Sequence, residues 1–260
     1  MNTTGFEALR DIFGPNRYEL KFYPAPSGQR SRFALICPGG GYECVMSSIE
    51  GKPIAQALNE RGYSAFVLRY RCRARAKYPT PLVDIARAVR EILANADAYN
   101  VETQDYAVFG FSAGGHLAAM FGVQALGWGK FNLPRPGVLV LSYPVVTMGA
   151  KTHEGSRKNL LDNAPIKAEI NRCSVEKQAN SHYPPTFVWC GDSDKTVDPD
   201  NSKMLADALE SHHVQHMLRI YPGVDHGVGL GKGLSCENWL DEAIAFWKSQ
   251  ESVTKCKNSL

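Results

Sequence analysis

The feature of this sequence that most restricts its fold is a set of short, nearly uninterrupted apolar runs, separated by longer segments with helical periodicity. A strand carries such a run when both faces of its sheet are covered, as in the centre of a parallel sheet. Strands that alternate with helices predict an α/β fold, with a mostly parallel central sheet and helices on both faces. The apolar runs are 33–36, 65–68, 138–141 and 187–189.

Periodicity also locates the remaining elements. Apolar residues recur at three- and four-residue steps over 80–98, which predicts a helix with one stripe facing the sheet. We expect further helices at 52–61, 113–125, 201–211 and 237–250. We expect strands at 18–23, 32–37, 64–70, 105–110, 138–142, 186–190 and 217–221.

A length of 260 residues with 44% hydrophobic content fits one large α/β domain or two small domains, since either can bury a sizeable core. We predict a single domain over residues 1–260. A net charge of +3 gives no reason to expect a nucleic-acid partner. Membrane insertion is not expected, since no run approaches the ~20 apolar residues of a spanning helix. The first fifteen residues lack the apolar block of a secretory signal, so we expect a cytoplasmic protein.

The seven cysteines are scattered and show no CxxC pair. Metal sites and disulfide frameworks usually show a characteristic spacing. We therefore expect buried, reduced thiols and no metal site.

One long segment, 147–183, breaks the alternation of strands and helices. It is polar and shows no clear strand pattern. Because connections of this length are more often functional than not, we interpret it as a small cap or lid insertion over the site.

The sequence Gly-Phe-Ser-Ala-Gly at 110–114 follows an apolar strand pattern and opens a helical one. This is the G-x-S-x-G pattern in the strand–turn–helix context that it requires, which makes Ser112 the candidate nucleophile. We expect side chains at Gly110 and Gly114 to collide with the tight turn. A second glycine loop, Pro-Gly-Gly-Gly-Tyr at 38–42, suits an oxyanion hole, with the Ala113 N–H as a further donor. Tyr42 directly follows these glycines, so we expect it to line the acyl pocket.

The base and the acid should follow late strands, because the triad in this fold runs in the order Ser, acid, His. Of the seven histidines, His226 lies on a loop between the last predicted strand and the last helix. Asp192, Asp194 and Asp198 compete for the acid position. The spacing Gly191-x-x-Asp-x-x-Val197, common in hydrolases of this kind, favours Asp194. Such a triad performs nucleophilic acyl transfer through an acyl-enzyme.

Several short motifs spread over the chain from about residue 37: PGGGY at 38–42, EGxPIA at 50–55, FVLxYR at 66–71, GFSAGGH at 110–116, GSRxNLL at 155–161, PPTFVW at 184–189 and HG at 226–227. Together they resemble the bacterial acetyl xylan esterase group of the α/β-hydrolase superfamily, which includes bifunctional feruloyl and acetyl xylan esterases.

The resemblance implies the α/β-hydrolase fold and the triad Ser112, Asp194 and His226. It implies that Gly40, Gly41 and Ala113 supply the oxyanion N–H groups. It further implies a cofactor-independent esterase acting on short-chain acyl, chiefly acetyl, esters of small carbohydrates such as acetylated xylo-oligosaccharides. One departure concerns the acid loop, where Cys-Gly-Asp at 190–192 replaces the His-Thr-Ala frequent in the group.

Several alternatives about function and about single residues stay open at this point. The same triad serves general short-chain lipase-like esterases and arylformamidases, and a hydrolase fold can also be a catalytically silent binding protein. The basic run at 69–77 is either a solvated loop or a site for an acidic sugar. Trp128 is a candidate sugar-stacking residue. The sequence does not define the oligomeric state.

Overall fold

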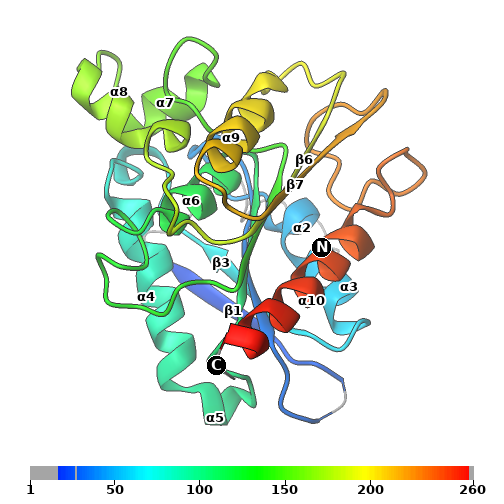
Figure 1. The fold of residues 1–260 in the computed structure, drawn as a ribbon. Helices are drawn as coiled ribbons and strands as arrows, with labels where there is room; N and C mark the ends of the chain where they lie inside the picture. Colours follow the sequence, from blue (N-terminus) through cyan, green and yellow to red (C-terminus); the bar gives the residue numbers. More distant parts are fainter. Residues whose placement is uncertain (1–16, 27, 258–260) are drawn as a thin grey trace, which may run out of the picture.

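The computed structural model describes residues 17–26 and 28–257, and these residues form a seven-stranded sheet in the order β1-β3-β2-β4-β5-β6-β7 (Figure 1). All neighbours pair in parallel except β1, which pairs antiparallel with β3 at one edge. The predicted mostly parallel sheet is thus confirmed. The strands are β1 Glu19–Tyr23, β2 Phe33–Cys37, β3 Ser64–Arg69, β4 Ala107–Phe111, β5 Val138–Ser142, β6 Thr186–Gly191 and β7 His216–Tyr221.

Helices cover both faces of the sheet, and each face carries its own apolar core (Figure 1). α4, α6 and α9 pack on one face, whereas α3 and α10 pack on the other. Strands β2, β4 and β5 are buried along their whole length, which explains their continuous apolar runs. The helices are α2 Ser47–Glu50, α3 Lys52–Asn59, α4 Thr80–Ala94, α5 Ala96–Tyr99, α6 Ser112–Gly122, α7 Glu154–Leu161, α8 Lys167–Cys173, α9 Asp200–Ser211 and α10 Trp239–Lys257, with 3₁₀ helices η1 Arg73–Arg75 and η2 Val175–Lys177.

Several helix boundaries differ from the prediction, and for two of them the backbone angles show why. The helix expected at 80–98 is interrupted at Asn95, and α5 then ends where Asn100 adopts a left-handed conformation with φ 53°. α6 ends at Gly122 rather than near residue 125, because Val123 is extended with ψ 115°. Apolar periodicity continues past both points, so it does not mark where the backbone leaves the helix.

The segment 147–183 contains α7, α8 and η2, and Figure 1 shows α7 and α8 beside α9 at one end of the molecule. Its described residues include no strand, as predicted. The interpretation of this segment as a lid stays a prediction.

The basic run at 69–77 is held in ion pairs. Arg71 binds the buried carboxylate of Asp84, and Lys77 binds Asp162. Arg69 and Arg73 pair with other acidic side chains. Four of the five basic side chains thus pair with acidic groups of the protein, which gives no support to an acidic-sugar site but also shows an anchored run instead of a simply solvated loop.

The Trp128 side chain has structural contacts of its own. Its ring packs on the core, and its indole N–H donates to Gly122 O. The sugar-stacking interpretation of Trp128 therefore finds no support.

Five cysteines are buried and free, as expected, and Cys44 is free and half-buried.

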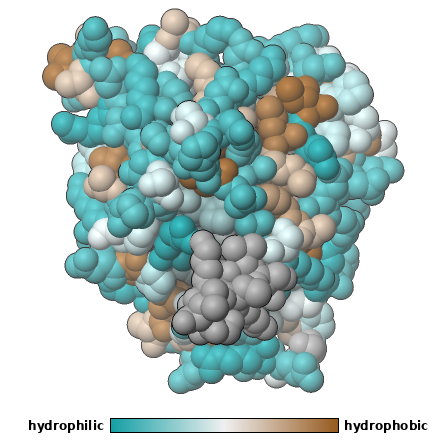
Figure 2. Space-filling view, in the orientation of Figure 1, coloured by the Kyte–Doolittle hydropathy of each residue, from teal (hydrophilic) through white to brown (hydrophobic). Residues whose placement is uncertain are grey.

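The face of the molecule shown in Figure 2 is largely hydrophilic, with separate apolar patches. In the described part of the chain, no helix combines the length and the apolar character needed to cross a bilayer. The expectation about a secretory signal concerns the first fifteen residues, which lie outside the described range.

Candidate active site

Ser112 lies at the turn between β4 and α6, at the carboxyl edge of the sheet. Its backbone has φ 52°, a left-handed conformation that a non-glycine residue adopts at a strained turn. The turn packs against the neighbouring strand so closely that a Cβ on Gly114 would lie 2.1 Å from Cys37 O. A Cβ on Gly110 would lie 2.6 Å from Gly114 O. The predicted collisions at both glycines are confirmed.

His226 lies on the loop after β7, between Ser112 and Asp194. Its Nε2 is 2.8 Å from Ser112 Oγ, and its Nδ1 is 2.7 Å from Asp194 Oδ2. A carboxylate only accepts hydrogen bonds, so Nδ1 carries the proton and Nε2 is left to accept the serine hydroxyl. The structure thus brings together three residues that are spread over 114 positions of the sequence.

Asp194 is fixed by backbone amides on the loop after β6. Its Oδ1 accepts hydrogen bonds from Thr196 N and Val197 N, both at 2.9 Å. The two competing aspartates serve other groups. Asp192 Oδ1 accepts from Gly223 N, and Asp198 Oδ1 accepts from Asp200 N at the start of α9. Among the three aspartates, Asp194 is therefore the one hydrogen bonded to His226.

The glycine loop after β2 passes over Ser112. Gly40 and Gly41 both have positive φ angles, 121° and 64°, and both line a cavity next to the serine. Within the described residues, neither amide donates to a protein acceptor. Asn159 of α7 donates to Gly41 O at 2.9 Å. Ala113, the third predicted donor, begins the first turn of α6 directly after Ser112.

Glu50 is a buried carboxylate that connects the glycine loop to the base. Its Oε2 accepts Gly39 N at 2.7 Å, and its Oε1 accepts the Tyr143 hydroxyl at 2.8 Å. The Tyr143 ring packs edge-on against the His226 imidazole, with centroids 4.8 Å apart. Burial and the adjacent Glu50 raise the pKa of Tyr143, so its hydroxyl stays protonated. One carboxylate thus contacts both the glycine loop and the tyrosine that packs on His226.

Tyr42 does not line the acyl pocket, which corrects the sequence prediction. Its backbone is left-handed, with φ 58°, and its side chain is 1% exposed. Its hydroxyl lies 2.8 Å from His116 Nδ1, and His116 Nε2 lies 2.7 Å from Cys173 O. A carbonyl only accepts, so His116 donates from Nε2 and Tyr42 donates to Nδ1. Burial lowers the pKa of His116 to about 4, which keeps this ring neutral.

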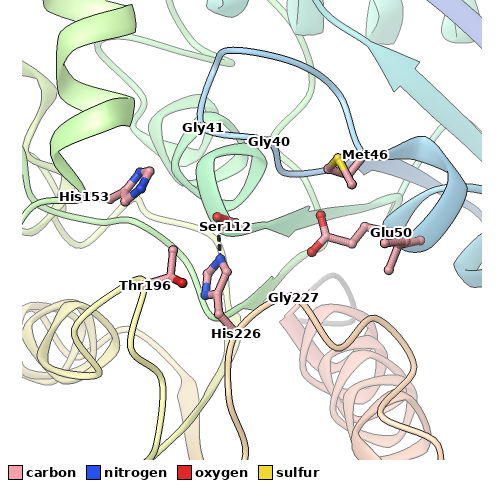
Figure 3. A pocket seen from close by; sticks show the side chains of 10 residues that line it. Gly40, Gly41, Met46, Glu50, Ser112, His153, Thr196, His226 and Gly227 are labelled. Carbon is pink, nitrogen blue, oxygen red and sulfur yellow. Dashed lines mark hydrogen bonds between the residues drawn. The ribbon is translucent and has the colours of Figure 1, made fainter. Parts of the chain in front are cut away.

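The cavity above Ser112 has a volume of about 190 Å³. In Figure 3, His153 and Thr196 lie on one side of Ser112, and Met46 and Glu50 lie on the other. Sequence reasoning gave no role to these four residues or to Tyr143. For Tyr143 a signal was present, because it directly follows the predicted strand 138–142 and so belongs to the same sheet edge. Besides the predicted residues, the cavity is lined by Met46, Ile49, Glu50, His153, Thr196 and Gly227.

Within the described residues, no three His, Cys, Asp or Glu side chains lie close enough to form a metal site. The candidate active site brings together a serine, an imidazole, a carboxylate and the glycine loop. This set can activate a hydroxyl and stabilise an oxyanion, which are the two requirements of acyl transfer.

Comparison with known proteins identifies the family. The BD-FAE family model matches residues 22–127. The chain is 36% identical over 215 residues to endo-1,4-beta-xylanase B of Butyrivibrio fibrisolvens, matching 79% of this chain and 34% of that protein. It is 28% identical over 227 residues to an acetylxylan esterase of Xylanibacter ruminicola, matching 85% of this chain and 46% of that protein. The chain thus spans a third to a half of these relatives.

A solved structure aligns over nearly the whole chain. The acetyl ester-xyloside bifunctional hydrolase from Caldicellulosiruptor lactoaceticus superposes with a TM-score of 0.81 at 33% identity. The match covers 98% of this chain and 94% of that one. The chain belongs to the acetyl xylan esterase group of the α/β-hydrolase superfamily, a family of carboxylic ester hydrolases.

Proposed function

We propose that the protein is a serine esterase that hydrolyses short-chain acyl esters of carbohydrates, chiefly acetyl esters such as those of acetylated xylo-oligosaccharides. The observation that carries this proposal is the single imidazole of His226, hydrogen bonded at once to Ser112 and to Asp194. The acetyl xylan esterase relative and the acetyl ester-xyloside hydrolase supply the substrate class.

The mechanism follows from the donors and acceptors. His226 Nε2 takes the Ser112 proton as Oγ attacks the ester carbonyl carbon. The resulting oxyanion receives hydrogen bonds from the Gly40, Gly41 and Ala113 amides. His226 then gives the proton to the departing sugar oxygen, which leaves an acyl-Ser112 ester. Water, deprotonated by the same imidazole, attacks that ester and releases the carboxylic acid and the free serine.

The dimensions of the cavity favour a short acyl group. Its volume of about 190 Å³ is below the roughly 300–1,000 Å³ of sites that enclose drug-sized ligands. Met46 and Ile49 supply an apolar wall. An acetyl group fits such a space, whereas a long acyl chain would have to leave it.

The test compares acetate release from acetylated xylobiose with hydrolysis of p-nitrophenyl esters of increasing chain length. We expect acetate release from the sugar and, among the p-nitrophenyl esters, the highest kcat/KM for acetate. Turnover of long-chain esters alone would refute the substrate class. Ser112→Ala should abolish both the activity and labelling by a fluorophosphonate, with Ser211→Ala, an exposed serine on α9, as the control. A wild-type protein that is not labelled would instead indicate a silent binding protein.

A further inference from the structure

His153 lies at the start of α7 in the segment 147–183 and lines the cavity. The proposed mechanism gives it no role. Its ring edge lies next to the oxyanion loop, since Cε1 would be 3.6 Å from a Cβ on Gly41. In Figure 3, it lies on the opposite side of Ser112 from Met46 and Glu50.

The hydrogen bonds of His153 fix its tautomer. Its Nδ1 accepts the backbone N–H of Ser156 at 3.2 Å and lies 2.9 Å from the Ser156 hydroxyl. Because an amide N–H can only donate, Nδ1 must carry a lone pair, and the proton of the neutral ring must be on Nε2. Burial, and secondly the nearby His226, lower the pKa of His153, which favours this neutral ring. Among the described residues, Nε2 has no hydrogen-bond partner.

The two sides of the cavity differ in polarity. Met46, which directly precedes α2, and Ile49, which lies within it, present apolar surface. Both Glu50 oxygens are already bonded to Gly39 and Tyr143. The opposite side presents His153 and Thr196. When the carbonyl oxygen of an acetyl ester occupies the oxyanion hole, its methyl group is therefore favoured against Met46 and Ile49. Its alcohol portion is then favoured beside His153 and Thr196.

We propose that His153 is a specificity-determining residue whose Nε2–H donates a hydrogen bond to an oxygen of the sugar that carries the ester. This inference rests on the proposed function, because it requires a carbohydrate leaving group. The donor has a fixed direction, since the cap of α7 holds the ring, and it selects alcohols that present an acceptor beside the ester.

A pair of variants separates this role from the helix cap. His153→Asn keeps an acceptor for Ser156 N but is too short to place an N–H where Nε2 lies. His153→Gln places an amide N–H near the Nε2 position but loses the cap. His182→Asn, at an exposed histidine of the same segment, is the matched control. Each variant is assayed on acetylated xylobiose and on p-nitrophenyl acetate, whose leaving group has no sugar oxygen.

We expect His153→Asn to lower kcat/KM for acetylated xylobiose by about 10- to 100-fold, mainly through KM, because a sugar oxygen loses its donor. Its kcat/KM for p-nitrophenyl acetate should stay within about threefold. His153→Gln should recover much of the sugar activity, and the control should resemble wild type. Equal losses on both substrates, or no loss on either, would overturn the inference. A wild-type protein that cleaves only p-nitrophenyl acetate would overturn the proposed function as well.

Discussion

The two halves of the site are built differently. On the sheet half, Ser112, Asp194 and His226 follow three strands and are fixed by main-chain geometry: a strained turn at the serine and two amide hydrogen bonds to the aspartate. On the half formed by 147–183, side chains reach the site from α7, such as Asn159 and His153. The difference suggests a division of labour, in which the sheet half determines the chemistry and the α7 half determines which alcohol is accepted.

The sheet half should show the largest effect when Asp194 no longer orients His226 and stabilises its charged form. Asp194→Asn would present an N–H to His226 or favour the wrong tautomer, so kcat should fall by about 10⁴-fold. Hydrolysis of p-nitrophenyl acetate and acetylated xylobiose should fall equally. The control is Asp192→Asn, because Asp192 faces Gly223 N rather than the imidazole. Comparable losses in both variants would contradict the assignment of the acid.

His116 joins the two halves, and its protonation should loosen them. The pKa of His116 is about 4 in the folded protein and near 6.5 when exposed, so the unfolded chain binds this proton first as the pH falls. The free energy of unfolding should therefore decrease by about 3 kcal/mol between pH 6.5 and pH 4 through this residue. Denaturant titrations across this range measure the slope.

His116→Asn removes the titrating ring but keeps an acceptor for Tyr42. In this variant, the contribution of residue 116 to the pH slope should disappear, although the protein should be less stable at pH 7. An unchanged slope would show that His116 does not titrate with unfolding.

Glu50 tests whether the sheet half acts as one unit. Glu50→Ala leaves the Gly39 N–H and the Tyr143 O–H without an acceptor, although Tyr143 still accepts from Gly229 N, and a buried donor without an acceptor costs about 1–3 kcal/mol. We expect kcat to fall by about 10- to 100-fold on both substrates, because the oxyanion loop and the support of His226 loosen together. Glu50→Gln should be intermediate. A wild-type kcat in Glu50→Ala would show that the loop is ordered without this carboxylate.

Asn159 gives the smallest expected effect, since it supports the oxyanion loop from the α7 side through one hydrogen bond to Gly41 O. Asn159→Ala should lower kcat/KM about five- to tenfold, the consequence of losing roughly 1 kcal/mol. Asn163→Ala, at an exposed asparagine of the same segment, is the control. A loss of kcat/KM as large as that of Glu50→Ala would contradict the division, because the α7 half would then affect the chemistry as strongly as the sheet half.

The same division separates what sequence can predict from what it cannot. The strand order along the chain and the G-x-S-x-G turn place Ser112 and His226 at one edge, because parallel strands end together. The prediction of Asp194 also required the Gly-x-x-Asp-x-x-Val spacing, since three aspartates lie on the same loop. The prediction that Tyr42 lines the acyl pocket was wrong, because its left-handed backbone turns the ring inward. No pattern in the sequence predicts that φ angle. Glu50 and His153 reach the site through tertiary packing and carry no periodic signal.

The position of the triad within the strand order has a consequence for how the protein becomes active. The serine follows β4 in the middle of the sheet, whereas the aspartate and the histidine follow β6 and β7, the two strands at one edge. These contacts join residues 32 and 114 positions apart, and the loop-closure entropy of such distant contacts slows folding. During refolding, esterase activity should consequently return only when β6 and β7 have packed against the rest of the sheet. Substrate turnover is therefore a stringent measure of complete refolding.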